Sequence, residues 1–473
     1  MSTVTRPAGQ AAKRVSAENE ALALRIADAC VSIDPATIPD NVIEKVKVCL
    51  RDLIGCAIES HALPWSRQAI ALAQPVATHS RRASIIAESI RASFADAAFA
   101  NAVMGHGLVR EDMHSGSVSH LGIVVLPTLL ALSQYRRVSG RRFCAAAMIG
   151  YEVGAKVGQA AMSPEIARIH RPTGISGPIG AAAAGAYLLG LDRDAISSAI
   201  ALGANTTLGF NQWAHTGGSE MFFQAGFAAR NALSAALLAE AGAFASPSAL
   251  DGEAGLFASL DRRASVSAIT IFDGAPEILS VYHKPVPACN FAQTPTQAAL
   301  AIARKSKMAP ETIASIRIRV PRAGMMYPGC NHSGPFAHIL QAKMSIQYNV
   351  AAALIRGSVS EQNFTLLNDP VLGRLISVMT LQVDDSMTQA YPAQQGGEVE
   401  VTDSGGSSQR IRLDNVVNAT DQEVRDRFQR EATAAYGDAR AGRLEDSIQN
   451  IEQAQYAGEL AEQFALAGNT VAR

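Results

Sequence analysis

Three of the ten histidines of the chain lie within residues 101–122, which also hold an Arg-Glu-Asp triplet at 110–112. These histidines are His106, His114 and His120, and two strongly apolar runs flank the segment. Histidine gains and loses a proton more readily near neutral pH than other side chains do. A chain that is 48% hydrophobic and only 18% charged has little structural reason to gather titratable groups in one place. We therefore predict a proton-transfer site in this segment.

Metal binding is a second interpretation of the same segment. His106, His114, His120 and Asp112 together offer imidazole nitrogens and a carboxylate, which suit zinc or iron. The spacings of eight and six residues between the histidines match no common helical or loop pattern of a metal site. We therefore favour proton transfer and expect no metal.

The overall composition excludes several classes of partner. The formal net charge is −1 and no run of like charges occurs, so we expect neither nucleic-acid binding nor a charged interaction tail. The most apolar window, 177–191, is shorter than the roughly 18 residues of a membrane span. Six scattered cysteines without CxxC spacing are typical of a reduced, cytoplasmic protein. Residues 1–19 lack the apolar stretch of a secretory signal, and we predict a disordered tail there.

No common nucleotide or hydrolase motif occurs in the chain. Residues 174–180 have the spacing GxxGxxG, whereas a dinucleotide fingerprint needs GxGxxG between a strand and a helix. We predict that this glycine-rich segment begins a helix, whose free N–H groups are able to hold a carboxylate. The sequence has no Walker loop, HExxH motif or GxSxG elbow.

The elements that position these residues are mainly helical as far as about residue 275. Apolar residues recur at helical spacing after Pro39, with Gly55 inside the pattern, which indicates that another helix packs closely there. The same periodicity predicts further helices at 92–105, 124–136, 141–160, 176–190, 194–203 and 222–242.

The periodicity of apolar residues changes after about residue 275. Alternation of apolar and polar residues predicts strands at 316–320, 379–383 and 399–401. Helices are predicted at 293–303 and at 342–355, the second one closed by Gly357.

A capping box at Thr420–Glu423 then starts terminal helices. The predicted fold is mainly α, with a large all-α helical domain and a smaller inserted α+β lid domain. The first part of the helical domain spans residues 20–275, the lid spans 276–410, and residues 411–473 return to the helical domain. A cleft between the two domains is the default place for a site.

Several blocks of the sequence, including the one that contains His120, resemble motifs of the MmgE/PrpD family. The resemblance covers residues 20–435, most of the chain, and its several ordered blocks are specific to the family but not to one activity. The blocks are Asn101–His106, His120 with 124–132, Pro172–Gly174 with 180–191, Gly226–Arg230, Lys284–Cys289 and Ala342–Tyr348.

The resemblance implies a cofactor-free, metal-free enzyme with a helical domain and a smaller lid, usually a homodimer. Members act on small di- or tricarboxylates by proton chemistry at the carbon next to a carboxylate. Such a C–H is weakly acidic, so its removal needs a positioned base and cationic or hydrogen-bonding groups where enolate charge develops.

Four residues of this chain match residues of the family motifs, and the match implies their roles. His120 is the expected base, and Asp112 is expected to orient it or to tune its pKa. Lys284 is expected to hold a substrate carboxylate or to stabilise the enolate. Tyr327 is the expected proton donor, with a structural position at an interface as the alternative.

Other positions depart from the family pattern. Val109 and Met113 stand where decarboxylase-like members have an aspartate and a threonine, and Met221 replaces a lysine, beside Glu220 and Gln224. Loss of a lysine and an aspartate changes the charge of the pocket and predicts a substrate unlike that of the best-known relatives. Glu220 and Gln224 become candidate substrate-binding residues.

Arg171 occupies the position of a family histidine, and His170 precedes it. An arginine next to a helix N-terminus is able to clamp a carboxylate through two parallel hydrogen bonds, with a structural role as the alternative. We therefore include Arg171 and His170 among the candidate substrate-binding residues. His106 and His114 are included as well, although a structural role is favoured for both.

The leading hypothesis is a lyase, a dehydratase or decarboxylase of a small di- or tricarboxylate. An epimerase that uses two bases on an aspartate- or succinate-type dicarboxylate is the first alternative. A carboxylate-binding protein without catalysis is the alternative from another class.

Overall fold

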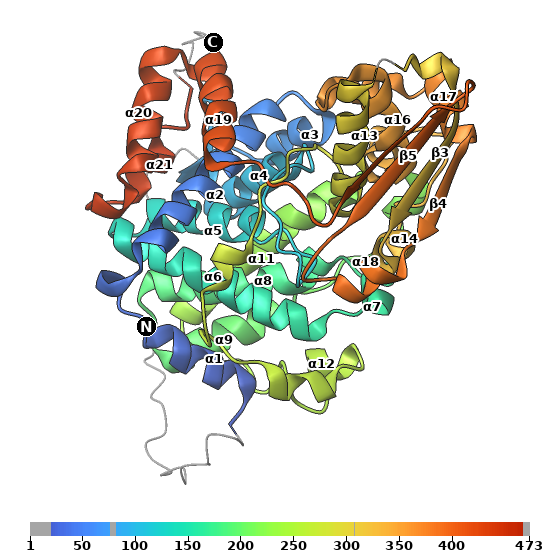
Figure 1. Ribbon diagram of the computed structural model, residues 1–473. Helices are drawn as coiled ribbons and strands as arrows, with labels where there is room; N and C mark the ends of the chain where they lie inside the picture. The colour runs from blue at the N-terminus through green and yellow to red at the C-terminus, as the bar shows by residue number, and fades with distance from the viewer. Residues whose placement is uncertain (1–19, 76–81, 307, 467–473) are drawn as a thin grey trace.

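Helices dominate the computed structural model, which describes residues 20–75, 82–306 and 308–466 (Figure 1). The predicted disordered tail at residues 1–19 lies outside this described part. The first unit is a helical bundle with one short antiparallel hairpin of β1 and β2. Its elements are α1 (Leu22–Val31), α2 (Asp40–Glu59), α3 (Pro64–Leu72), β1 (Arg82–Ser84), β2 (Arg91–Ser93), α4 (Phe94–His106), α5 (Gly122–Tyr135), α6 (Gly140–Ala161), α7 (Pro164–Ile169), α8 (Pro172–Leu189), α9 (Arg193–Ala204), α10 (Trp213–Thr216), α11 (Glu220–Glu240) and α12 (Leu256–Ser259).

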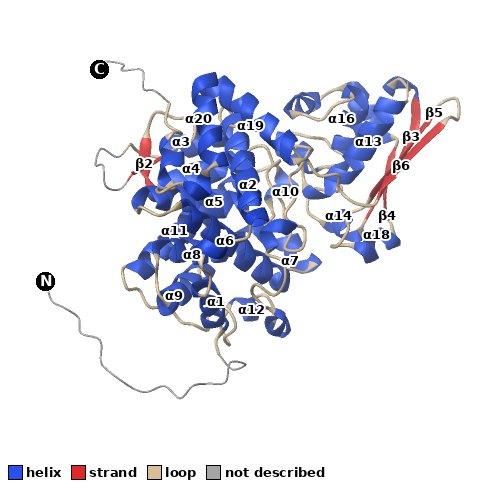
Figure 2. Cartoon of the chain, turned by 60° about the vertical axis from the view of Figure 1, so that its left-hand side comes forward, coloured by secondary structure: helices blue, strands red, loops and turns tan. Residues whose placement is uncertain are grey.

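The second unit is a four-stranded sheet with helices packed on it (Figure 2). The strand order is β4-β3-β5-β6, in which β3 is parallel to β4 and antiparallel to β5. Helix α13 packs on β5 and β6, and α16 packs on α13. The elements are α13 (Gln293–Lys305), β3 (Ile313–Val320), α14 (Arg322–Met326), α15 (Ile339–Met344), α16 (Ile346–Arg356), α17 (Pro370–Ser377), β4 (Met379–Val383), α18 (Asp385–Ala390), β5 (Gly397–Asp403) and β6 (Ser408–Leu413).

The last helices return to the first unit. They are α19 (Asp421–Tyr436), α20 (Asp438–Gln449) and α21 (Gly458–Glu462). Helix α19 packs along α2, where a Cβ on Gly55 would lie only 3.3 Å from the Cα of Phe428. The close helix neighbour that Gly55 indicated is therefore α19.

The mainly α fold with a smaller α+β part is confirmed, as are the three predicted strands. One predicted helix, at 342–355, is instead two helices that meet at Ser345. The Ser345 side chain accepts a hydrogen bond from the backbone N–H of Tyr348 and so begins a new helix at Ile346. Strand β6 was not predicted, because its outward-facing residues are charged or polar and it lies at the sheet edge.

The centre of the bundle is the contact between α6 and α8. A Cβ on Gly180 would lie 2.4 Å from the carbonyl oxygen of Gly150 and 2.9 Å from the Cα of Gly154. The small residues of α8 thus allow two helix backbones to touch, which explains the apolar window rich in alanine and glycine.

Gly180→Ala is expected to destabilise the protein by about 1–3 kcal/mol, because the added methyl group cannot avoid backbone atoms. Gly373→Ala in α17 is the matched control, since a Cβ there meets nothing within 4 Å and alanine favours helix formation. Urea unfolding measures both variants. Equal midpoints for Gly180→Ala and the wild type would contradict this packing.

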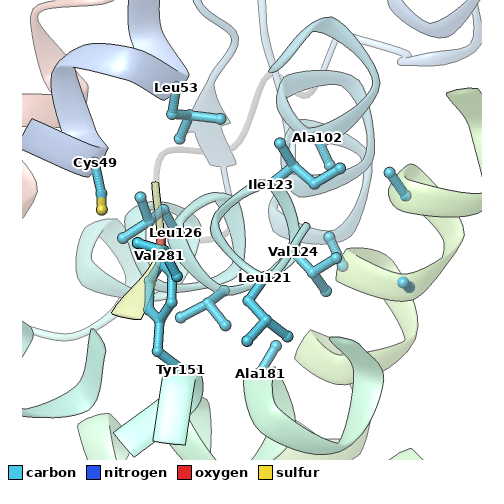
Figure 3. Close-up of a cluster of buried hydrophobic side chains, with 14 of the residues drawn as sticks. Cys49, Leu53, Ala102, Leu121, Ile123, Val124, Leu126, Tyr151, Ala181 and Val281 are labelled. Carbon is cyan, nitrogen blue, oxygen red and sulfur yellow. The ribbon is translucent and has the colours of Figure 1, made fainter. Parts of the chain in front are cut away.

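The bundle core lies directly beneath the histidine segment. Figure 3 shows Leu121 and Ile123, which follow His120, packed among side chains such as Leu53, Ala102 and Ala181. A rigid core therefore holds the start of α5, which His120 precedes by two residues. Among the described residues, no helix combines the length and the apolar character needed to cross a lipid bilayer.

Candidate active site

The histidine segment is a turn between two core helices. Helix α4 ends at His106 and α5 begins at Gly122, so both ends of the turn are fixed by buried helices. Within the turn, Val109 and Val118 have φ angles of 58° and 53°. Left-handed backbone is rare for β-branched residues and clusters at functional sites. Both valines line a small cavity of about 10 Å³, together with His120, Arg171 and Tyr327.

Glu111 lies between two histidines of the segment. Its Oε1 atom is 2.5 Å from Nδ1 of His106 and 2.9 Å from Nδ1 of His120. All three side chains are buried. One carboxylate therefore fixes the orientation of both imidazoles.

His120 presents an unprotonated nitrogen to the cavity. Its Nδ1 is within reach of two acceptors, Oε1 of Glu111 and the backbone oxygen of Asp112 at 3.0 Å, so the proton resides on Nδ1. Among the described residues, no partner is found for Nε2. Burial, and next the nearby Lys284 ammonium, lower the pKa of His120 to about 3 despite the opposing effect of Glu111. The ring is thus neutral at neutral pH and has the form of a base.

Glu111 and Lys284 form the charged layer behind His120. Burial opposes ionisation of Glu111, but His106, His120 and Lys284 outweigh it and hold the pKa of Glu111 well below its usual value. Burial also lowers the pKa of Lys284, whose Nζ donates to the backbone oxygen of Ala288 at 3.3 Å. Lys284 is completely buried and does not line the cavity. This placement does not support the predicted direct contact of Lys284 with a substrate.

Arg171 connects the turn to the second unit. Its Nη2 donates to Nε2 of His106 at 3.0 Å, and its Nη1 donates to the hydroxyl of Tyr327 at 3.1 Å. The guanidinium carries five N–H groups, so donors remain for a carboxylate in the cavity. Burial raises the pKa of Tyr327, although Arg171 opposes the shift, and the hydroxyl stays protonated. The structure thus brings Arg171, His106 and Tyr327 together with His120.

The Asp112 carboxylate points away from His120. It accepts hydrogen bonds from the Tyr151 hydroxyl and from the backbone N–H of Gly122. Only the backbone oxygen of Asp112 contacts His120. The prediction that the Asp112 side chain orients the base is therefore corrected: Glu111 occupies that position.

The sequence analysis named the triplet 110–112, which includes Glu111, but assigned no role to Glu111. The available signal was its spacing of five residues from His106 and nine from His120, which became informative only once the turn was folded.

Several other predicted residues lie elsewhere. His114 pairs with Glu277 at 3.0 Å and with the Ser117 hydroxyl, which stabilises the turn rather than facing the cavity. His170 pairs in a short β-bridge with Phe210, and its Nδ1 is buried without a described partner. Neither histidine lines the cavity.

Glu220 and Gln224 also lie outside the cavity. Glu220 is exposed at the start of α11, and the Gln224 amide donates to the backbone oxygen of Phe210. Met221 is the residue of this helix turn that lines the cavity. One position along a helix rotates a side chain by about 100°, so Glu220 faces away from Met221, whereas Gln224 is kept from the cavity by its hydrogen bond to Phe210.

His106, Glu111 and His120 form the described group that comes nearest to a metal-binding set, with donor atoms within 4.8 Å of one another. Their facing atoms already pair internally, and the charges of Lys284 and Arg171 oppose a further cation. His114 and Asp112, which the metal interpretation needed, are not part of this group. The arrangement fits proton transfer better than coordination.

Comparison with known proteins agrees with the sequence blocks. Residues 24–268 match the MmgE/PrpD N-terminal domain, and residues 286–453 match the MmgE/PrpD C-terminal domain. Together these two matches span most of the described chain.

Individual relatives align with part of the chain. The cis-aconitate decarboxylase-like protein oryM of Aspergillus oryzae is 32% identical over 220 residues, which is 44% of this chain and 45% of that protein. Cis-aconitate decarboxylase of Aspergillus terreus is 31% identical over 215 residues, which is 43% of each protein. The alignments thus span less than half the length of these relatives.

Proposed function

Because the chain belongs to the MmgE/PrpD family, we propose that it is a lyase that eliminates water or CO2 from a small di- or tricarboxylate. The observation that carries this proposal is the neutral His120, whose Nδ1 is held by Glu111 while its other nitrogen is at the cavity. Two relatives are a cis-aconitate decarboxylase and a protein named as similar to one, which supports carboxylate chemistry.

The proposed dehydration begins with a substrate carboxylate on Arg171. Nε2 of His120 takes a proton from the neighbouring carbon, and Glu111 stabilises the imidazolium that forms. The electron pair then forms a C=C bond as the C–O bond breaks, and Tyr327 protonates the leaving hydroxide.

In a decarboxylation, the C–C bond to one carboxylate breaks instead, and CO2 leaves. The electron pair remains on carbon and takes up a proton from a cavity residue. Tyr327 and His120 line the same cavity, so an epimerase that uses both as proton carriers is the second candidate.

NMR of citrate-, aconitate- and aspartate-derived carboxylates in D2O tests the proposal. We expect a product that has lost water or CO2. Deuterium in the unchanged substrate with inversion would favour the epimerase. Binding of tricarboxylates without any turnover would favour a non-catalytic relative.

We further propose that two copies of the chain associate through the exposed side of α11. Phe227 and Leu238 are 50% and 51% exposed, and their spacing of three helical turns places them on one face. Exposed large apolar side chains on one helix face are candidates for a protein–protein interface.

Phe227→Glu is therefore expected to convert a dimer to a monomer in sedimentation velocity. Val417→Glu is the control, because Val417 is 60% exposed on a loop far from α11 in sequence. A wild-type protein that sediments as a monomer at all concentrations would contradict the dimer.

A further inference from the structure

A second, larger cavity adjoins the one that holds His120. Its volume is about 230 Å³, and it is called the outer chamber below. Three residues, Val118, Phe291 and Tyr327, line both cavities, so the two meet at these side chains. These three side chains therefore form the boundary between the cavity beside His120 and the outer chamber.

The outer chamber lies where the two units of the fold meet. Gln159 at the end of α6 and Ala167 in α7 line one side. Met326 at the end of α14 lines the other side, and Figure 1 shows α14 beside α7. Gln159 is exposed, so the chamber reaches the surface there.

None of the thirteen residues that line the outer chamber is charged. Most of the lining is apolar, with Met162, Phe291 and Tyr391 as its larger members. A carboxylate placed there would lose its hydration without gaining a cationic partner, which is unfavourable. A hydrocarbon group placed there would leave water for an apolar surface.

The cavity beside His120, called the inner cavity below, is also lined mainly by uncharged side chains. Arg171 is the only arginine or lysine that lines it, and two of its nitrogens already contact His106 and Tyr327. Val109, Met113 and Met221 line the inner cavity where carboxylate-binding side chains would otherwise be possible. The positive charge that faces the substrate is therefore too small for three carboxylates.

We infer that the substrate carries a hydrocarbon arm in place of one carboxylate arm of a tricarboxylate. Its acidic end binds Arg171 beside His120, and its arm passes between Val118 and Phe291 into the outer chamber. This inference rests on the proposed function, because it names the class of substrate on which that site acts.

Calorimetry with non-reacting succinates substituted at C2 tests the inference on the full chain. The probes are 2-methyl-, 2-propyl- and 2-hexylsuccinate, with 2-(carboxymethyl)succinate as the matched probe whose arm ends in a carboxylate. We expect Kd to fall roughly fourfold for each added methylene from methyl to propyl. We also expect 2-propylsuccinate to bind more tightly than the carboxymethyl compound. Equal or tighter binding of the carboxymethyl compound, or no binding of any probe, would overturn the inference.

Two variants locate the arm. Ala167→Phe fills the outer chamber and should abolish the gain from methyl to hexyl. Ile169→Phe is its control, because Ile169 lies two residues along the same helix, is 52% exposed and does not line the chamber. Gln159→Lys, at an exposed position that tolerates charge, should weaken 2-hexylsuccinate binding and strengthen carboxymethylsuccinate binding. A gain with chain length that survives both Ala167→Phe and Gln159→Lys would place the arm elsewhere and overturn the inference.

Turnover separates this inference from the proposed function. Elimination from unsubstituted carboxylates that depends on His120 but gains nothing from an alkyl arm would overturn the inference alone. Binding that improves with arm length, without turnover of any alkyl-substituted hydroxy- or unsaturated carboxylate, would overturn the lyase and leave recognition of the arm in place.

Discussion

Replacement of His120 with alanine is expected to lower kcat/KM by roughly two to four orders of magnitude, the usual contribution of a positioned general base. The expectation follows from the neutral imidazole whose free nitrogen is at the cavity. Steady-state kinetics on any substrate found in the carboxylate screen measures it.

His114→Gln is the matched control for His120→Ala. His114 belongs to the same turn and is equally buried, but it contacts Glu277 and Ser117 rather than the cavity. We expect this variant to be less stable and to keep kcat/KM within a few fold. Equal losses in both variants would show that the turn as a whole, and not His120, supports activity.

The pH profile of the wild type gives an independent check on His120. A base must be unprotonated to act, so kcat/KM falls as the pH drops through its pKa. Burial and the Lys284 charge lower the pKa of His120 to about 3, so the acid limb should lie far below the usual histidine value. If kcat/KM of the wild type instead fell near pH 6.5, and only His120→Ala removed this acid limb, the lowered pKa of His120 would be contradicted.

Glu111→Gln is expected to have the second large effect. The substitution removes the negative charge that holds Nδ1–H of His120 and stabilises its protonated form. Loss of the equivalent carboxylate in catalytic triads costs about four orders of magnitude in kcat, and we expect a loss of roughly two to four orders here. The variant should also be less stable by up to about 3–5 kcal/mol, because Lys284 loses its buried counter-charge.

Asp112→Asn distinguishes this arrangement from the one that sequence reasoning predicted. Burial raises the pKa of Asp112, and its carboxylate contacts Tyr151 and Gly122, so a neutral amide should be tolerated. Kinetics of Glu111→Gln, Glu111→Asp and Asp112→Asn form one series. We expect partial recovery with aspartate at 111 and a small effect at 112; the reverse order would return the orienting role to Asp112.

Three of the four positions that depart from the family pattern have a common location in the structure. Val109, Met113 and Met221 come from two distant segments, and all three line the cavity that holds His120. Their apolar side chains and the uncharged outer chamber point to the same kind of substrate. Their neighbours Glu220 and Gln224, which sequence reasoning also proposed, face other surfaces.

The sequence by itself determined most of the long helices of the bundle, three of the four strands of the larger sheet and the segment that carries the base. These features follow from local periodicity and from the types of residue within one short turn, and they need no knowledge of distant contacts. The choice of His120 came from the family resemblance, and that of Arg171 came from its place beside a helix N-terminus, where the family has a histidine.

Only the tertiary structure decided which carboxylate serves His120. Glu111 and Asp112 are adjacent in sequence, but the carboxylate of Glu111 contacts the histidines and that of Asp112 contacts Tyr151. Lys284 is remote in sequence from this turn, and its burial behind Glu111 depends on how the two units pack. Charge coupling acts through distance in space rather than along the chain, so the pKa values of the site follow from the fold.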